Sequence, residues 1–286
     1  MQLMMARARM NHQSSGPTGS ILDSLSVSSV GAYSLRKLRD AYVGNCIKVR
    51  RSSDSALLDV GFSNGALDSA AVLAFVGTGD GYIYTWYDQS GYGRDFAQVS
   101  SAQPKIVSVG ALTMQGTKPT SLFSSSRLAA TINAFAAGFC VNAVAIVKSG
   151  SLPALVDKST TSGIAAPWMM FGTNGQWNRC YLGDGSVQNF YAPTVPTGTL
   201  QVITHDADAS SKLANFYANG TLNNSATVST TYADTANLVT LGGRGDGSTN
   251  LQGNLSETIL FAAPLPTADR HTLERNQGTY YGIAVA

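Results

Sequence analysis

The sequence predicts an all-β protein, a sandwich of short antiparallel strands with a few short helices. Short segments rich in β-branched and aromatic residues recur between residues 82 and 261, separated by Gly, Asn, Asp or Ser. Asn219-Gly220, directly after Phe216-Tyr217, is the strongest hairpin signal in the chain. Charged residues make up only 13% of the sequence and hydrophobic residues 44%. Polar but uncharged residues must therefore cover a sizeable core.

The first part of the chain predicts two helices and one strand. Residues 30–42 space Leu35, Leu38 and Tyr42 as one face of a short helix. Residues 46–51 alternate between apolar and polar side chains, which predicts a strand. Residues 66–76 predict a second helix, which Asp68 or Ser69 would cap.

The rest of the chain predicts strands and one closing helix. We expect strands at residues 82–87, 139–147, 168–171, 179–182, 200–205, 213–217, 238–241 and 255–261. A last helix or turn is expected from Thr267 to Asn276, because Asp269 lies early in it and Arg275 lies late.

Residues 82–93, Tyr-Ile-Tyr-Thr-Trp-Tyr-Asp-Gln-Ser-Gly-Tyr-Gly, are the most informative segment. Asp88 and Ser90 can bond nearby backbone, and glycines tolerate positive φ, so this strand is expected to end in a tight corner. Strict alternation places aromatic residues on one face and a mixed set on the other, namely Tyr82, Tyr84 and Trp86 against Ile83, Thr85 and Tyr87.

Charge divides the chain into a basic head and a weakly acidic body. Residues 1–51 hold eight Lys or Arg against two Asp, a charge of +6, so the net charge of +2 leaves −4 for the remainder. Residues 1–20 end in a linker rich in Gly, Pro and Ser. We therefore predict an N-terminal attachment arm at residues 1–31 and a β-sandwich domain at residues 32–286. A protein surface is the expected partner of the arm, since no aromatic residues interleave with its arginines as in a nucleic-acid groove.

Cysteine and histidine patterns favour neither disulfides nor metals. Cys46, Cys140 and Cys180 are odd in number and lack metal-ligand spacing, so we expect buried apolar residues and folding in a reducing cytosol. The three histidines are scattered, so no zinc site, His-based triad or cofactor is predicted. Arginines interrupt the apolar start of the chain, unlike a signal peptide, and no run of about 20 apolar residues predicts membrane insertion.

Several motifs, in order, resemble one known family. Tyr87-Asp-Gln-Ser-Gly-x-Gly93 is similar to the signature of the catalytic domain of fungal α-L-arabinofuranosidase B, a concanavalin A-like domain. Residues 47–54 resemble its opening strand, and Leu241-Gly-Gly-Arg-Gly-Asp-Gly-Ser248, with Gln252-Gly253 and Glu257, resembles its closing motif. The likeness covers roughly residues 32–282. It implies one jelly-roll β-sandwich of the concanavalin A-like class behind the N-terminal arm.

The resemblance also assigns the chemistry of that family to positions in this chain. The family resembles a retaining glycosidase, which needs two carboxylates about 5 Å apart. Its acid/base falls on Asp246. Its nucleophile, a Glu just before Tyr-Leu-Gly, falls on Asn178, and a neutral amide forms no glycosyl-enzyme intermediate. The expectation is therefore a sandwich without catalytic residues, not an enzyme.

Relatives of this domain also occur in bacteriophage virion proteins. Residues 35–39, 49–54 and 85–91 resemble the lectin-like domains of phage tail or capsid-surface proteins. This resemblance implies a virion structural protein, assembled in the host cytoplasm, that joins other virion proteins through its arm. It also implies a homo-oligomer that binds host-surface glycan. The alternatives are an active arabinofuranosidase-like retaining glycosidase and a ligand-free scaffold or decoration protein.

Three residues are the candidates for carbohydrate binding: Trp177, Asn178 and Asp246. Trp177 lies among Gly, Gln and Asn residues, where an aromatic ring can stack on a sugar, and Asn and Asp side chains suit hydroxyl pairs. Each also has a structural interpretation. Trp177 can belong to the core, and Asp246 can cap the Gly-rich turn between two strands. Arg244-Gly-Asp is interpreted as a chance match to a cell-adhesion tripeptide.

Overall fold

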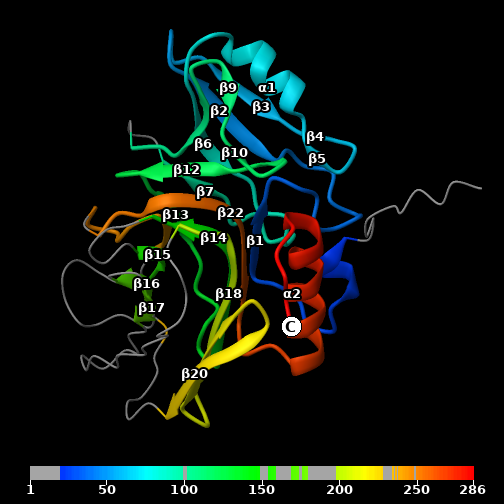
Figure 1. The fold of residues 1–286 in the computed structure, drawn as a ribbon, viewed down its shortest axis with the longest axis vertical. Helices are drawn as coiled ribbons and strands as arrows, with labels where there is room; N and C mark the ends of the chain where they lie inside the picture. Colours follow the sequence, from blue (N-terminus) through cyan, green and yellow to red (C-terminus); the bar gives the residue numbers. More distant parts are fainter. Residues whose placement is uncertain are drawn as a thin grey trace, which may run out of the picture.

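The computed structural model describes residues 20–98, 102–148, 154–158, 169–173, 176–179, 198–227, 234, 236, 238–247 and 249–286. The fold is all-β, as predicted, because nearly every element of the described ranges is an antiparallel strand. Figure 1 shows the strands stacked through the body of the molecule, with α1 at one end and α2 along one side. In that part of the chain, no helix is long and apolar enough to cross a membrane.

The element bounds are as follows. The helices are η1 (Ile21–Ser24), α1 (Ser69–Val76) and α2 (Thr267–Tyr281). The earlier strands are β1 (Gly31–Ser34), β2 (Ile47–Arg51), β3 (Leu57–Val60), β4 (Phe62–Ser63), β5 (Ala66–Leu67), β6 (Gly81–Trp86), β7 (Phe96–Ala97), β8 (Lys105–Ser108), β9 (Ala111–Leu112), β10 (Met114–Gln115), β11 (Lys118–Pro119), β12 (Ser121–Ser124) and β13 (Leu128–Thr131). The later strands are β14 (Gly138–Val147), β15 (Ala154–Asp157), β16 (Met169–Thr173), β17 (Gln176–Arg179), β18 (Gln201–Asp208), β19 (Leu213–Ala218), β20 (Thr221–Thr227), β21 (Leu238–Leu241) and β22 (Gln252–Phe261).

The strands form two layers that share one hydrophobic core. In the first layer β22 pairs with β1 and β12 on one edge and with β14 on the other, and β18, β19 and β20 follow β14. The second layer runs from β3 through β2, β6, β7, β13, β21, β15 and β16 to β17. Strand β8 joins the layers, since it pairs with both β6 and β12. Apolar side chains of both layers meet in one cluster, including Val141 and Leu255 from the first and Val49 and Leu241 from the second.

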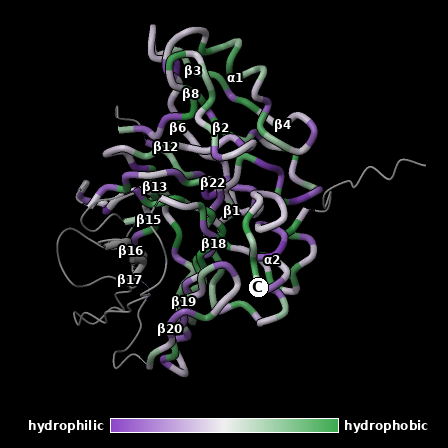
Figure 2. Tube along the Cα trace, viewed as in Figure 1, coloured by the Kyte–Doolittle hydropathy of each residue, from purple (hydrophilic) through white to green (hydrophobic). Residues whose placement is uncertain are grey.

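A second, smaller cluster lies on the outer side of the first layer. Ile21, Leu22 and Leu273 pack there against Cys140 and Ile259, so η1 and α2 cover the outer face of β14 and β22. Figure 2 shows α2 beside these strands, with polar and apolar residues mixed along its tube. Residues 20–31 therefore already pack against the sandwich, although they lie within the arm expected at residues 1–31.

The helix expected at residues 30–42 does not form. Residues 31–34 are strand β1, paired with β22, and the chain continues through a bend at Leu35 and a single bridge from Arg36 to Ala66, without helix. Two side chains of the 87–93 motif explain this. Asp88 Oδ1 accepts Ala32 N at 2.9 Å, and Gln89 Oε1 accepts Leu38 N at 2.8 Å. Gln89 Nε2 also donates to Ser34 O and Arg36 O. The motif therefore supplies hydrogen-bond partners to the backbone of this buried segment, which forms no helix despite the helical spacing of its apolar residues.

The strict alternation expected along residues 82–87 is interrupted by a β-bulge. Lys48 pairs with Thr85 and Val49 with Ile83, so Tyr84 is the extra residue. The bulge turns the fully buried Trp86 to the same side as Ile83, into the core. Tyr82 and Tyr84 stay on the opposite, outward side. The expected shared face of Tyr82, Tyr84 and Trp86 was therefore wrong.

Other local predictions are confirmed. Asp68 Oδ1 accepts Ala71 N at 3.0 Å and caps α1, and Asn219 and Gly220 both have positive φ in the hairpin between β19 and β20. The closing helix is longer than expected and ends at Tyr281, followed by Gly282 in the left-handed conformation. Residues 176–179 form β17, whereas residues 180–182 of the strand expected at 179–182 lie outside the described residues, as does Trp168. Cys46 and Cys140 are buried free thiols.

Candidate functional site

The closing motif forms a loop between β21 and β22 whose shape depends on glycine. Gly242 has φ of +80°, and a Cβ at this position would meet Phe123 Cδ1 at 2.0 Å. Gly242 N donates to Leu155 O at 2.9 Å, and Leu251 N donates to Gly242 O at 2.8 Å. The loop is therefore tied both to β15 and to its own base, and only glycine fits at its start.

Asp246 lies exposed on the tip of this loop. Gly247 N donates to Arg244 O at 3.0 Å and closes the turn that carries the carboxylate. A Cβ at Gly247 would meet Arg127 Nη1 at 2.3 Å, so the Arg127 guanidinium lies against the turn. The loop thus presents a carboxylate to solvent with Arg127 packed beside its backbone, an arrangement suited to polar ligands with hydroxyl groups.

Strand β15 supplies a second, buried carboxylate beside the loop. Asp157 pairs with Thr240, and the neighbours of Thr240, Val239 and Leu241, belong to the core. Thr240 and Asp157 therefore face away from the core. Thr240 Oγ1 donates to Gly243 O at 2.6 Å, which joins this face to the base of the loop. Asp157 is only 1% exposed.

Lys158 follows Asp157 and is fully buried. Its Nζ donates to Ile132 O at 2.6 Å and to Asn133 Oδ1 at 3.2 Å, and it lies 3.3 Å from Asp234 Oδ1. Burial lowers the pKa of Lys158, while Asp234 acts in the opposite direction. A buried cation of this kind fixes the end of β15 rather than contacting solvent.

Strand pairing places β17, the strand of Trp177 and Asn178, near β15. Ala154 pairs with Phe171, and Phe171 pairs with Arg179, so β17 lies two strands from β15, about 10 Å away. Ala154 N also donates to Thr249 O in the closing loop at 2.8 Å. The closing loop thus contacts β15 directly and β17 follows two strands further on, while the side chains of Trp177 and Asn178 lie outside what the structure describes. Their role in sugar binding stays a prediction.

Sequence reasoning missed Asp157, Lys158 and Arg127. A signal was available for the first two, because two charged residues directly follow the apolar run 154–156. Nothing in the sequence marks Arg127, which reaches the loop through the fold alone. Among the described residues, no group of three His, Cys, Asp or Glu side chains is placed to hold a metal ion.

Comparison with known proteins places the fold. No family model and no curated sequence matches the chain. An α-L-arabinofuranosidase of glycoside hydrolase family 54, soaked with a cyclic sulfate inhibitor, matches 90% of this chain and 63% of its own, with a TM-score of 0.73 and 15% identity. An arabinofuranosidase complexed with arabinofuranosyl-α-1,2-xylobiose matches 93% of this chain and 65% of its own, with a TM-score of 0.73 and 14% identity. The botulinum neurotoxin serotype D binding domain matches 90% and 53%, with a TM-score of 0.54 and 12% identity.

The chain therefore has the β-sandwich fold of the arabinofuranosidases, and it spans less than two thirds of their length. The expectation that it is not an enzyme is overturned, because these similar structures are arabinofuranosidases, one soaked with a cyclic sulfate inhibitor and one complexed with arabinofuranosyl-α-1,2-xylobiose. That expectation rested on one position, Asn178. Position 178 alone cannot exclude hydrolysis when carboxylates such as Asp157 and Asp246 lie at the same end of the sheet.

Proposed function

We propose that the chain is a carbohydrate-active domain that binds glycosides at the closing loop and hydrolyses them as an arabinofuranosidase-like glycosidase. The observation that carries the proposal is the glycine-fixed loop with its exposed Asp246, on a fold shared with arabinofuranosidases over about nine tenths of the chain. Asp246 would serve as acid/base at the leaving oxygen.

Asp157 is the carboxylate that we propose as partner of Asp246. It lies on the strand paired with β21, faces away from the core, and is joined through Thr240 to the base of the loop. A buried carboxylate is held in one position, which nucleophilic attack on a sugar carbon requires. Arg127, packed on the same turn, would hold glycan hydroxyls without reacting.

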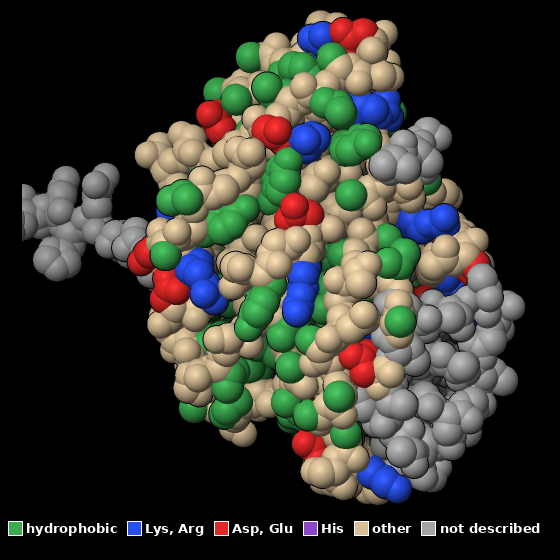
Figure 3. Space-filling model, turned by 180° about the vertical axis from the view of Figure 1, so that it is seen from behind, with side chains coloured by type: hydrophobic (Ala, Val, Ile, Leu, Met, Phe, Trp, Pro, Cys, Tyr) green, Lys and Arg blue, Asp and Glu red, His purple; other side chains and the backbone are tan. Residues whose placement is uncertain are grey.

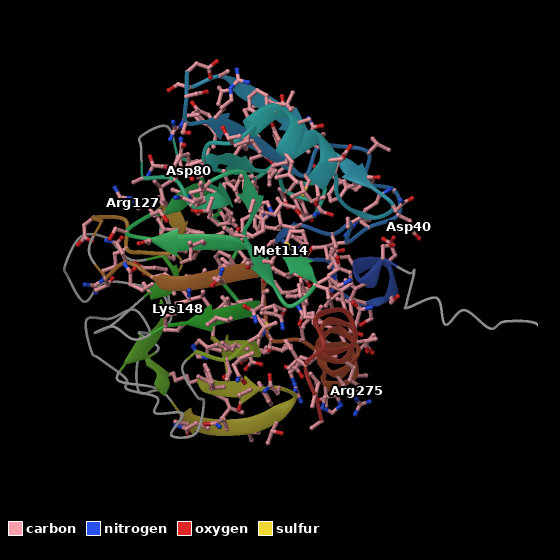
Figure 4. The ribbon with its side chains drawn as sticks, turned by 45° about the horizontal axis from the view of Figure 1, so that its top comes forward. Asp40, Asp80, Met114, Arg127, Lys148 and Arg275 are labelled. Carbon is pink, nitrogen blue, oxygen red and sulfur yellow. The ribbon has the colours of Figure 1, made fainter. Side chains whose placement is uncertain are left out.

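Turnover of aryl glycosides tests the proposal. The purified chain should release phenolate from at least one aryl furanoside, and Asp246→Asn should lower kcat by about 100-fold or more. Asp157→Asn should lower it further, since loss of a nucleophile removes the covalent step. Asp40→Asn is the matched control. Asp40 is also exposed, and Figure 4 shows it on the opposite side of the molecule from Arg127.

Two results would contradict hydrolysis. One is the absence of turnover on a panel of aryl furanosides and pyranosides. The other is equal activity of Asp246→Asn and Asp40→Asn. If binding persists in glycan titrations without turnover, Trp177→Ala should weaken it by roughly 1–3 kcal/mol, the contribution of one stacked aromatic ring.

We also propose a setting for this domain, a bacteriophage particle that displays it toward host-surface glycan. The supporting observation is the basic, Gly- and Pro-containing sequence of residues 1–19, which precedes the packed residues Ile21 and Leu22. This segment would join the domain to other virion proteins, and copies of the chain would assemble together. Mass spectrometry of purified bacteriophage particles tests the proposal. The absence of this chain from the particles would contradict it.

A further inference from the structure

A second surface lies at the opposite end of the second layer from β15 and β17, on the outward face of β3, β2 and β6 and of the adjoining β8. Antiparallel partners share a face, and Ile47 and Val49 of β2 point into the core. Lys48 and Arg50 therefore point outward. The half-buried tyrosines Tyr82, Tyr84 and Tyr87 lie beside them. We call this surface the tyrosine face, defined by Lys48, Arg50, Tyr82, Tyr84 and Tyr87.

The β-bulge at Tyr84 creates this face. Without the extra residue, Trp86 would stand in the same outward row as Tyr82 and Tyr84. With it, Trp86 is buried in the core and two rings of moderate size remain outside, next to hydrogen-bonding side chains. Bulges that redirect side chains in this way recur beside binding sites. A flat sheet face with aromatic rings and fixed polar groups suits a glycan chain.

Arg50 is held in place, and one edge of its guanidinium has no partner among the described residues. The guanidinium carbon lies 4.7 Å from the centre of the Tyr82 ring, and Nε donates to Gln103 Oε1 at 2.7 Å. Gln103 is buried and is itself anchored, because its Nε2 donates to Gln98 O. Within the described ranges, Nη1 and Nη2 of Arg50 make no hydrogen bond or ion pair. This edge matches the two oxygens of a carboxylate.

The other cations of this surface already have partners. Lys48 Nζ lies 3.6 Å from Asp59 Oδ2, and Lys105 Nζ donates to Asp80 Oδ2 at 2.7 Å, a bond that keeps the pKa of Asp80 below its ordinary value. The phosphates of a nucleic-acid backbone each carry a negative charge, so Asp59 and Asp80 would repel them. Figure 3 shows no single basic patch on the face opposite that of Figure 1, where Lys and Arg side chains are spread out and several lie beside Asp or Glu. One unpaired guanidinium fits a ligand with widely spaced carboxylates.

We propose that the tyrosine face binds a uronic-acid-containing polysaccharide, with a sugar ring on Tyr84 and a uronate carboxylate on the free edge of Arg50. The site is separate from the closing loop, and it does not depend on hydrolysis there.

Titration calorimetry with oligogalacturonate tests the site. The intact chain should bind the free acid, and full methyl esterification of the same oligosaccharide should weaken binding at least tenfold. Arg50→Ala should lower affinity at least tenfold, and Arg50→Lys, which keeps the charge and loses the fork, by a smaller factor. Tyr84→Ala should also weaken binding. Arg275→Ala, on the exposed side of α2, is the matched control and should change nothing.

Several outcomes would overturn the proposal. These are equal binding of the acid and its methyl ester, unchanged affinity in a folded Arg50→Lys, or tighter binding of a single-stranded oligonucleotide than of oligogalacturonate. Arg50→Lys keeps the test decisive if Arg50→Ala fails to fold. Asp246→Asn should leave oligogalacturonate affinity unchanged, so failure of this site and failure of the glycosidase are distinguishable.

Discussion

Arg36 and Glu257, 221 residues apart, form a two-pronged ion pair beneath α2. Arg36 Nε donates to Glu257 Oε2 at 2.7 Å and Nη2 to Oε1 at 3.0 Å. Ser34 Oγ and Gln277 Nε2 donate to the same carboxylate at 2.8 and 2.9 Å. Burial alone would raise the pKa of Glu257, but Arg36 and these hydrogen bonds lower it overall. Together with Ser34 and Gln277, the pair joins the end of β1, strand β22 and helix α2.

Arg36→Met should destabilise the protein by about 3–5 kcal/mol, because it leaves a buried carboxylate without its charge partner. The free energy of unfolding in urea measures this loss. The double variant Arg36→Met/Glu257→Leu should be clearly more stable than the sum of the two single losses predicts, since neither charge is then left alone. A loss below 1 kcal/mol for Arg36→Met would contradict this account.

The sequence predicted the sandwich and most strands, because alternation and turn residues are local signals. The hairpin at Asn219-Gly220 and the cap at Asp68 followed from such signals. The helix expected at 30–42 failed since its backbone partners, Asp88 and Gln89, are distant in sequence. The candidate site was foreseen only in part. Asp246 stood in a recognisable motif, whereas Asp157 and Arg127 reach the loop through strand pairing that no local pattern encodes.

Two truncations test how much the residues before β1 contribute to stability. Deletion of residues 1–19 should leave the unfolding free energy unchanged within about 0.5 kcal/mol. Deletion of residues 1–31 should cost more than about 3 kcal/mol, because it removes the buried Ile21 and Leu22. Thermal unfolding of both fragments beside the full chain checks this. Equal stability of the two fragments would show that residues 20–31 contribute nothing.

Val109 occupies an unfavourable turn position. It has φ of +50° ahead of Gly110 at +75°, and its side chain is 81% exposed. A β-branched residue is strained in this region, whereas Asn tolerates it. Val109→Asn should therefore stabilise the protein by about 1 kcal/mol in urea unfolding. Asn219→Val, at the equivalent position of the other hairpin, should destabilise it, and also loses the bond from Val202 N to Asn219 Oδ1.

Asp206 should make stability depend on pH. Burial raises its pKa to about 6, despite the bond from Asn215 and the charge of Arg270. The folded state therefore keeps a proton that the unfolded chain releases near pH 4, so this contribution is present at low pH and is lost as pH rises through 6. Between pH 5 and 7 the protein should lose about 1 kcal/mol relative to Asp206→Asn. The same change in the free energy of unfolding between pH 5 and 7 for both proteins would contradict the raised pKa of Asp206.

The central position of β22 has a consequence for how the chain reaches its fold. This strand pairs with β1 and β12 on one edge and with β14 on the other, yet it is the last strand to leave the ribosome. The first layer cannot close until residue 261 is available, so contact order is high and folding should be slow. Until then β1, β12 and β14 present open edges, and nascent chains of this protein should depend on chaperones to avoid pairing with one another.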